Sequence, residues 1–197
     1  MNGLSSAHII VDMKEVILSQ EDIRDIVKDL GARLTHDLAS EERPPVFLCV
    51  MKGALPFYSD LIKEVKRDIV CDYIQISSYG GGLSSSGTIH LTKDLDEDLN
   101  GRTLVIVEDI VDTGLSMHFL LEHIHSRFKT KKTLICALFD KDVNRKNEVR
   151  VDYCGRKLRE DKFLCGYGLD YKEILRNTPY VFVPTDEEID NWNKELG

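Results

Sequence analysis

The chain lacks a long apolar run and an excess of basic residues, and each absence removes a class of protein. The longest purely apolar run is residues 46–51, which is far too short to cross a bilayer as a helix. Lysine and arginine number 26 against 34 aspartates and glutamates, which gives a net charge of -8. Nucleic acids and anionic membranes both need a clustered basic face, so we expect neither as a partner.

Paired cysteines are also missing. The five cysteines are odd in number, and none has Cys-x-x-Cys spacing. They are Cys49, Cys71, Cys136, Cys154 and Cys165. Because most lie in apolar, strand-like runs, we predict reduced core thiols rather than disulfides. The first ten residues also lack a basic segment followed by a long apolar one, so we expect a cytoplasmic protein that is not exported.

The chain has the length of one domain. At 197 residues it is large enough to bury roughly 70% of its unfolded surface without disulfide or metal staples. It contains no internal repeat and no linker rich enough in glycine, proline or serine to divide it. We therefore predict a single domain over residues 1–197.

Helical and strand-like patterns alternate along this domain. Helical spacing of apolar residues occurs at 20–40, 54–66 and 116–127. Strand-like segments occur at 46–50, 70–77, 88–92, 103–107, 133–139, 149–153, 163–166 and 180–183. This alternation predicts an α/β fold with an open, mostly parallel twisted sheet flanked by helices.

The most informative turn joins strand 103–107 to the helix that follows. Thr113, Gly114 and Ser116 place small residues and two hydroxyls where backbone N–H groups begin that helix, which suits a dianionic phosphate. Leu115 adds no charge, so the backbone must supply most of the binding. In an open α/β sheet, ligands bind at such strand-to-helix turns.

Three carboxylates precede the phosphate turn. Glu108 and Asp109 can only accept hydrogen bonds while ionised, so they suit a pair of vicinal hydroxyls or a metal ion rather than phosphate. Together with the turn they indicate a ribose 5-phosphate. Asp112 would stand over the sugar, where a carboxylate is a candidate general base.

Residues 104–116 resemble the 5-phosphoribosyl 1-pyrophosphate (PRPP) motif of the type I phosphoribosyltransferases. That motif reads apolar strand, Glu/Asp-Asp, two apolar residues, Asp-Thr/Ser-Gly, any residue, Thr/Ser. A second segment, residues 161–171, is similar to the Asp-Lys-Phe…Gly-Tyr-x-x-Asp-Tyr segment of the hypoxanthine-guanine branch. The resemblance covers about residues 46–183. It implies the phosphoribosyltransferase core there and a small hood over the base from residues 1–45 and 184–197.

The resemblance implies which residues read the purine. Phe163 would stack on the base, and the backbone of Leu164 would read its edge. Lys141 would donate to the exocyclic 6-oxygen. An ammonium has only donors, so it selects oxo bases over adenine, whose amino group also presents donors.

The resemblance further implies the residues that hold the leaving group. Lys52 and Gly53 occupy the family's pyrophosphate loop, which contains a non-proline cis peptide, and Arg176 matches an arginine that clamps pyrophosphate. Ser78 and Tyr79 match the catalytic-loop dipeptide. The glycine- and serine-rich tract after them cannot pack a core, so we expect a flexible lid that excludes water.

A magnesium cofactor is also implied. Asp170 matches the residue that binds Mg²⁺ carried by pyrophosphate, and Glu108 and Asp109 are the other carboxylates at hand. Such hard oxygen ligands are usual for this ion when it is shared with phosphates.

The predicted function is purine salvage. The enzyme would transfer the 5-phosphoribosyl group of PRPP to N9 of hypoxanthine or guanine, giving IMP or GMP and pyrophosphate, with Asp112 taking the proton from purine N7. Its substrates would be small molecules, and its assembly a homodimer or homotetramer.

Many relatives have a lysine or asparagine in place of Leu115 and an Ile-Pro-Asp turn where this chain has residues 158–161. The preference among hypoxanthine, guanine and xanthine therefore stays open.

Two functions of other classes remain. One is a PRPP-sensing regulator of the same fold that binds RNA or DNA, which would need a basic face and would have no need of Lys141 or Phe163. The other is a receiver-type signalling module that binds Mg²⁺ around a phosphorylated aspartate, which would not use the phosphate turn. Gly166 and Gly168 lack the third glycine of a dinucleotide fingerprint, so a nicotinamide cofactor is not expected.

Overall fold

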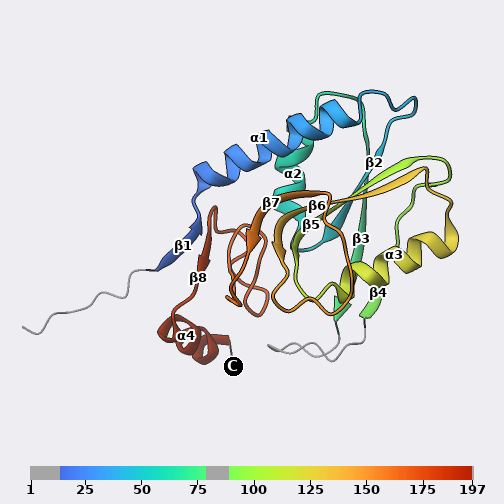
Figure 1. Cartoon of the computed structure of the whole chain (residues 1–197). Helices are drawn as coiled ribbons and strands as arrows, with labels where there is room; N and C mark the ends of the chain where they lie inside the picture. Colours follow the sequence, from blue (N-terminus) through green and yellow to red (C-terminus); the bar gives the residue numbers. More distant parts are fainter. Residues whose placement is uncertain (1–13, 79–88, 197) are drawn as a thin grey trace, which may run out of the picture.

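The computed structural model describes residues 14–78 and 89–196, and its main feature is a six-stranded sheet in the order β4-β3-β2-β5-β6-β7. The strands are β2 (Val46–Met51), β3 (Val70–Ser78), β4 (Ile89–Lys93), β5 (Thr103–Val111), β6 (Lys132–Lys141) and β7 (Tyr153–Leu158). Only β4, at one edge, runs antiparallel to its neighbour; the other pairings are parallel (Figure 1). The predicted open, mostly parallel sheet is confirmed. Tyr79 and the predicted lid tract lie outside the described residues.

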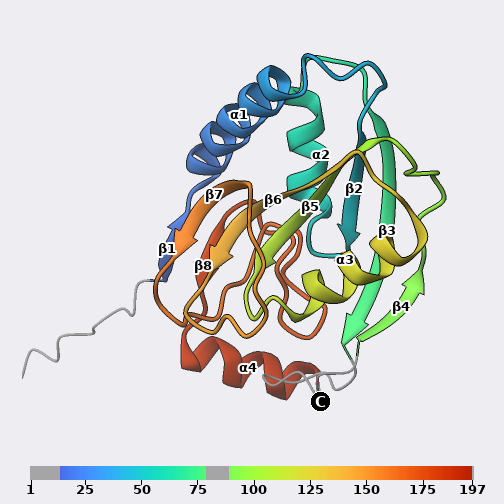
Figure 2. The same ribbon diagram turned by 45° about the vertical axis from the view of Figure 1, so that its right-hand side comes forward.

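Helices cover both faces of this sheet (Figure 2). Helices α1 (Gln20–Asp37) and α2 (Leu55–Glu64) pack on one face, and α3 (Leu115–Arg127) packs on the other. Strand β2 is buried between them: Phe47 and Cys49 face α1 and α2, whereas Leu48 and Val50 belong to the core on the α3 side. Side chains of a strand alternate between faces, so this apolar run fills both cores.

Helix α1 begins at a reciprocal cap. The Ser19 hydroxyl accepts a hydrogen bond from the Asp22 backbone N–H, and the Asp22 carboxylate accepts one from the Ser19 backbone N–H. Such a cap stabilises a helix by about 1 kcal/mol. The apolar stripe of the helix is buried from Ile23 to Leu34.

A second, two-stranded sheet joins the two ends of the described chain. Strand β1 (Glu15–Leu18) pairs antiparallel with β8 (Val181–Val183), and helix α4 (Asp186–Leu196) follows β8. Figure 2 places α4 at the carboxyl ends of the parallel strands. A small unit built from the two terminal segments therefore exists, but its bounds differ from the predicted ones. Helix α1, which lies within the predicted residues 1–45, packs against α2 and the main sheet, whereas β8 comes from the predicted core.

The structure differs from the predicted elements in several places. The predicted strand at 163–166 is wrong, because only an isolated bridge from Cys165 to Phe182 forms there, and β1 and α4 were not predicted. Strand β5 continues to Val111, so Glu108 lies within the strand opposite Ala137 of β6 instead of in the turn. The predicted strand at 149–153 is wrong, because pairing with β6 starts only at Tyr153 and continues to Leu158. Strand β7 was not predicted because its apolar pattern is weak. Its Gly155 lies so close to α1 that a Cβ at this position would be 2.7 Å from Ile26 Cγ2.

The thiols follow the prediction in part. All five cysteines are free, and Cys49, Cys136 and Cys165 are buried in the core. Cys71 is exposed and Cys154 is half-buried, so these two do not belong to it. In the described part of the chain, no helix combines the length and the apolar character needed to cross a membrane.

Candidate active site at the carboxyl ends of the strands

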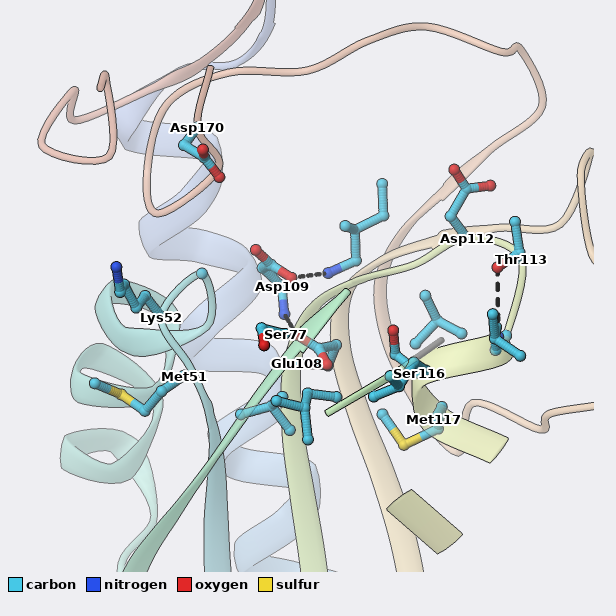
Figure 3. Close-up of a pocket in the computed structure, with 18 of the residues that line it drawn as sticks. Met51, Lys52, Ser77, Glu108, Asp109, Asp112, Thr113, Ser116, Met117 and Asp170 are labelled. Atoms are coloured by element: carbon cyan, nitrogen blue, oxygen red, sulfur yellow. Dashed lines mark hydrogen bonds between the residues drawn. The ribbon is translucent and has the colours of Figure 1, made fainter. Parts of the chain in front are cut away.

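A cleft of about 380 Å³ opens where β2 and β5 end. It is lined by residues 50–53 and 108–117 and by Ile76, Ser77, Ile89, Asp170 and Arg176. Figure 3 shows Asp109 between two groups of residues, with Lys52 and Asp170 on one side and Asp112 on the other. The fold thus brings together the predicted phosphate turn, acidic residues and pyrophosphate residues, which are far apart in sequence.

The phosphate turn has the backbone that its sequence demands. Gly114 precedes α3 with φ 79°, a left-handed conformation that favours glycine. A Cβ at this position would also lie 2.6 Å from the backbone oxygen of Asn147. The first N–H groups of α3 have no partner within the helix, so the turn presents donors and the positive end of the helix dipole to the cleft.

Arg145, which no sequence motif indicated, braces this turn from outside the cleft. Its Nε donates to the backbone oxygen of Asp112 at 2.8 Å, and Nη2 donates to that of Val111 at 3.1 Å. Nη1 donates to the backbone oxygen of Val149 at 2.8 Å, and the guanidinium pairs with Asp140. One side chain therefore joins the end of β5, the end of β6 and the loop after it.

The acidic pair at the end of β5 is desolvated. Glu108 and Asp109 are only 8% and 9% exposed. Burial and the neighbouring Asp109 carboxylate raise the pKa of Glu108 well above its usual value, and burial raises the pKa of Asp109 as well. Asp109 accepts from the Ile110 backbone N–H at 2.7 Å. Buried carboxyls with raised pKa values gain most from a ligand that supplies a cation or hydroxyl donors.

Two glycines allow three segments to meet at the acidic pair. A Cβ on Gly53 would lie 1.8 Å from Oδ2 of Asp109, and a Cβ on Gly168 would lie 1.9 Å from the backbone oxygen of Gly53. Gly168 also has φ 101°. The loop after β2, which contains the cis peptide bond Met51-Lys52, is thus packed between β5 and the second motif. These contacts explain why the second motif has a glycine at position 168.

Two cationic side chains, Lys52 and Arg176, line the wall of the cleft opposite the phosphate turn. Arg176 Nη2 lies 2.8 Å from Oδ1 of Asp170, and its Nη1 donates to the backbone oxygen of Gly168. Lys52 Nζ pairs with Glu173, a residue that the sequence did not single out, at 2.8 Å. The Nε of Arg176 is buried and has no hydrogen-bond partner among the described residues. Because buried donors are rarely left unpaired, this atom marks a place for an acceptor.

The predicted purine residues lie beside the cleft rather than in its lining. Lys141 ends β6, is 5% exposed, and places Nζ 3.2 Å from Oδ2 of Asp112 and in contact with Asp161. Burial alone would lower the pKa of Lys141, but the bonds to Asp161 and Asp112 outweigh it and raise that pKa. Leu164 is buried, whereas Phe163 is 39% exposed.

Comparison with known proteins agrees with this arrangement. Residues 15–172 match the family model described as the phosphoribosyl transferase domain. The chain is 42% identical over 172 residues to the hypoxanthine-guanine phosphoribosyltransferase of Bacillus subtilis, a match that covers 87% of this chain and 93% of that protein. It is 41% identical over 176 residues to the enzyme of the same name from Streptococcus thermophilus, covering 89% and 96%.

Solved structures give the same result. The crystal structure of a hypoxanthine phosphoribosyltransferase from Staphylococcus aureus superposes with a TM-score of 0.81 at 38% identity and covers 93% of this chain and 98% of that one. The family model spans most of the chain and includes the phosphate turn, the acidic pair and the whole of the second motif, residues 161–171. The chain belongs to the phosphoribosyltransferase family and resembles its hypoxanthine-guanine members.

Proposed function

We propose that this protein transfers the 5-phosphoribosyl group of PRPP to N9 of a 6-oxopurine, hypoxanthine or guanine, and releases pyrophosphate. The observation that carries the proposal is the cleft, in which a helix N-terminus, a buried acidic pair and a cationic wall face one another. These three groups match the 5-phosphate, the ribose hydroxyls and the pyrophosphate of PRPP in chemistry and in order.

The chain holds PRPP at both ends in this proposal. The 5-phosphate accepts from the backbone N–H groups that begin α3, and the two ribose hydroxyls donate to Glu108 and Asp109. Lys52 and Arg176 bind pyrophosphate, and the unpartnered Nε of Arg176 supports this role. As the bond from C1′ to pyrophosphate breaks, its electron pair leaves with pyrophosphate and the cations neutralise the departing charge.

Asp112 and Lys141 serve the incoming base. Oδ1 of Asp112 is buried and accepts no hydrogen bond from residues 14–78 or 89–196, while Oδ2 faces Lys141. Oδ1 is therefore the oxygen free to take the N7 proton as N9 bonds to C1′. Lys141 donates to the 6-oxygen, and its contact with Asp161 holds the ammonium in the charged form that this role needs.

The carboxylates of the cleft also fit magnesium. Among residues 14–78 and 89–196, no cluster of three or more side chains forms a ready metal site. Mg²⁺ retains waters and binds through one or two carboxylates together with substrate phosphates, so Asp170, with Glu108 and Asp109 nearby, provides the protein ligands that it needs. When bound, the ion neutralises pyrophosphate and improves it as a leaving group.

Product formation tests the proposal directly. The protein is incubated with PRPP and Mg²⁺, and hypoxanthine, guanine, xanthine or adenine is supplied separately. Turnover of oxopurines without turnover of adenine supports both the reaction and the role of Lys141, and the relative rates rank the three oxopurines. PRPP binding without turnover of any base would replace the enzyme with a PRPP-sensing regulator.

We also propose a single domain over residues 1–197, with small molecules as substrates, a cytoplasmic location and assembly into a homodimer or homotetramer. The relatives named above span nearly the whole chain, which supports one domain. Sedimentation velocity of the full chain measures the assembly, and a monomer at micromolar concentration would contradict it.

A further inference from the structure

Three aromatic side chains connect the purine side of the site to the C-terminal helix. Phe163 meets Tyr171 edge to face, with ring centroids 6.0 Å apart and planes at 86°. Tyr171 in turn lies 5.7 Å from Trp192 of α4. We call Phe163, Tyr171 and Trp192 the aromatic ladder. Trp192 is the only tryptophan of the chain.

The ladder is fixed at its α4 end by polar contacts. Tyr171 donates its hydroxyl hydrogen to Oδ1 of Asn193 at 2.7 Å. Lys14 bonds to Glu188 of α4 at 3.0 Å and lies over the ring of Phe182 in β8. Helix α4 is therefore held both to the loop that carries Tyr171 and to the small sheet.

The loop that carries Tyr171 needs such support. Lys172, Glu173 and Leu175 all have φ between 47° and 74°, a region that side chains other than glycine rarely adopt. Backbone hydrogen bonds between Tyr171 and Ile174 close this turn. Ion pairs of Glu173 with Lys52 and Arg176 hold this turn on the cleft side. We expect the position of the Tyr171 ring, at the start of the turn, to depend in addition on the side chains of α4 that contact it.

The orientation of the Phe163 ring also depends on Tyr171. Phe163 is 39% exposed, and the perpendicular contact with Tyr171 orients its ring. An exposed aromatic face held in one orientation is suited to stacking on a flat heterocycle. A Tyr171 ring that moved would allow Phe163 to turn, and base stacking would weaken.

We propose that α4 contributes to binding of the purine base. Trp192 and Asn193 are positioning residues, which act on the base through Tyr171 and Phe163. The inference rests on the proposed function, because it takes Phe163 as the residue that stacks on the base. It extends that function to a helix that touches neither the phosphate turn nor the cleft.

Steady-state kinetics of Trp192 variants in the full chain test this proposal. Trp192→Ala should raise the KM for hypoxanthine and guanine about 3- to 10-fold, the range of one aromatic contact. The KM for PRPP and kcat should change less than about 2-fold, because the phosphate turn is untouched. Trp192→Phe should restore most of the base KM, and Glu195→Gln, an exposed position of the same helix, should change nothing.

The fluorescence of Trp192 provides a second readout in the unmodified chain. Saturating GMP should change its emission, whereas saturating ribose 5-phosphate, which lacks the base, should leave it nearly unchanged. Tyr171→Ala should remove the GMP response. This measurement also serves if Trp192→Ala fails to fold.

The outcomes separate the two proposals. Wild-type protein that turns over no base overturns the proposed function itself. Wild-type turnover together with an unchanged base KM in Trp192→Ala overturns the role of α4 alone. Equal rises of the KM for base and for PRPP would also overturn it, because they would show a disturbance of the whole site rather than of the base side.

Discussion

The two ends of the site are built in different ways. The phosphate turn, residues 112–116, lies between β5 and α3, so regular elements fix its backbone from both sides. The base side is formed mainly by residues 159–176, a stretch without a named strand or helix that is held by ion pairs and aromatic contacts. Sites built on strands and helices are held more rigidly than sites on loops.

The difference indicates that the two ends have separate roles, donor binding at the phosphate turn and base binding at the loop. Every reaction of a phosphoribosyltransferase uses the same phosphoribosyl donor, which a rigid backbone turn recognises. The accepting base varies, and loop side chains can change without disturbing the sheet. In this chain Asp161 contacts Lys141, and Lys162 bonds to Glu15 at 2.7 Å, so charges hold the segment where many relatives have a proline turn. The variants that follow test this difference between the two ends.

The largest effect is expected at Asp112, where the two ends meet. Asp112→Asn should lower kcat by roughly 10² to 10⁴ with little change in PRPP affinity, because the amide cannot take the N7 proton. Single-turnover product formation and PRPP titration measure the two quantities. Unchanged turnover would remove Asp112 from the role of general base.

The brace of the phosphate turn should come next. Arg145→Met removes charged donors from three backbone oxygens, so kcat/KM for PRPP should fall by about 10- to 100-fold, more than the same ratio for the base. Arg150→Met, in the same loop but with its side chain 89% exposed, is the matched control. Equal losses in the two variants would show that the brace has no special importance.

A smaller effect is expected on the base side. Asp161→Asn should raise the KM for hypoxanthine and guanine about 3- to 10-fold, since Lys141 loses the partner that holds its ammonium. The exposed Asp161 side chain is screened by salt, so the base KM of wild-type protein should rise with ionic strength and that of the variant should not. Glu160→Gln, which leaves Lys141 untouched, serves as control, and a shift in the KM for PRPP instead of the base would contradict the prediction.

The smallest effect concerns stability. Burial raises the pKa of Glu108 in the folded chain above its unfolded value of about 4.3, so its ionisation lowers folding stability as pH rises from the unfolded pKa to the folded one. Without ligands, Glu108→Gln should therefore raise the unfolding temperature at pH 7, by roughly 2–4 °C for each kcal/mol regained. The gain should vanish near pH 4. A variant that is less stable than wild type at pH 7 would contradict this reasoning.

Local patterns were enough for the elements with strong signals. The capping box and apolar stripe predicted α1, and the apolar runs predicted β2 and the first part of β5. Strand β7 was missed because its sequence, in which Gly155 is followed by Arg156 and Lys157, lacks the apolar pattern of a strand. Its conformation is imposed by pairing with β6 and by the close approach of α1, which are contacts between segments distant in sequence.

From the amino-acid sequence alone we predicted the alternation of strands and helices, the phosphate turn and the acidic residues before it, because a strand-to-helix turn carries its chemistry in consecutive residues. The three-dimensional contacts were needed to find that Arg145 braces the turn, that Asp161 contacts Lys141 and that Tyr171 connects Trp192 with Phe163. Each of these contacts joins segments that fold separately and meet only when the sheet is complete, so no periodicity or spacing along the chain encodes them.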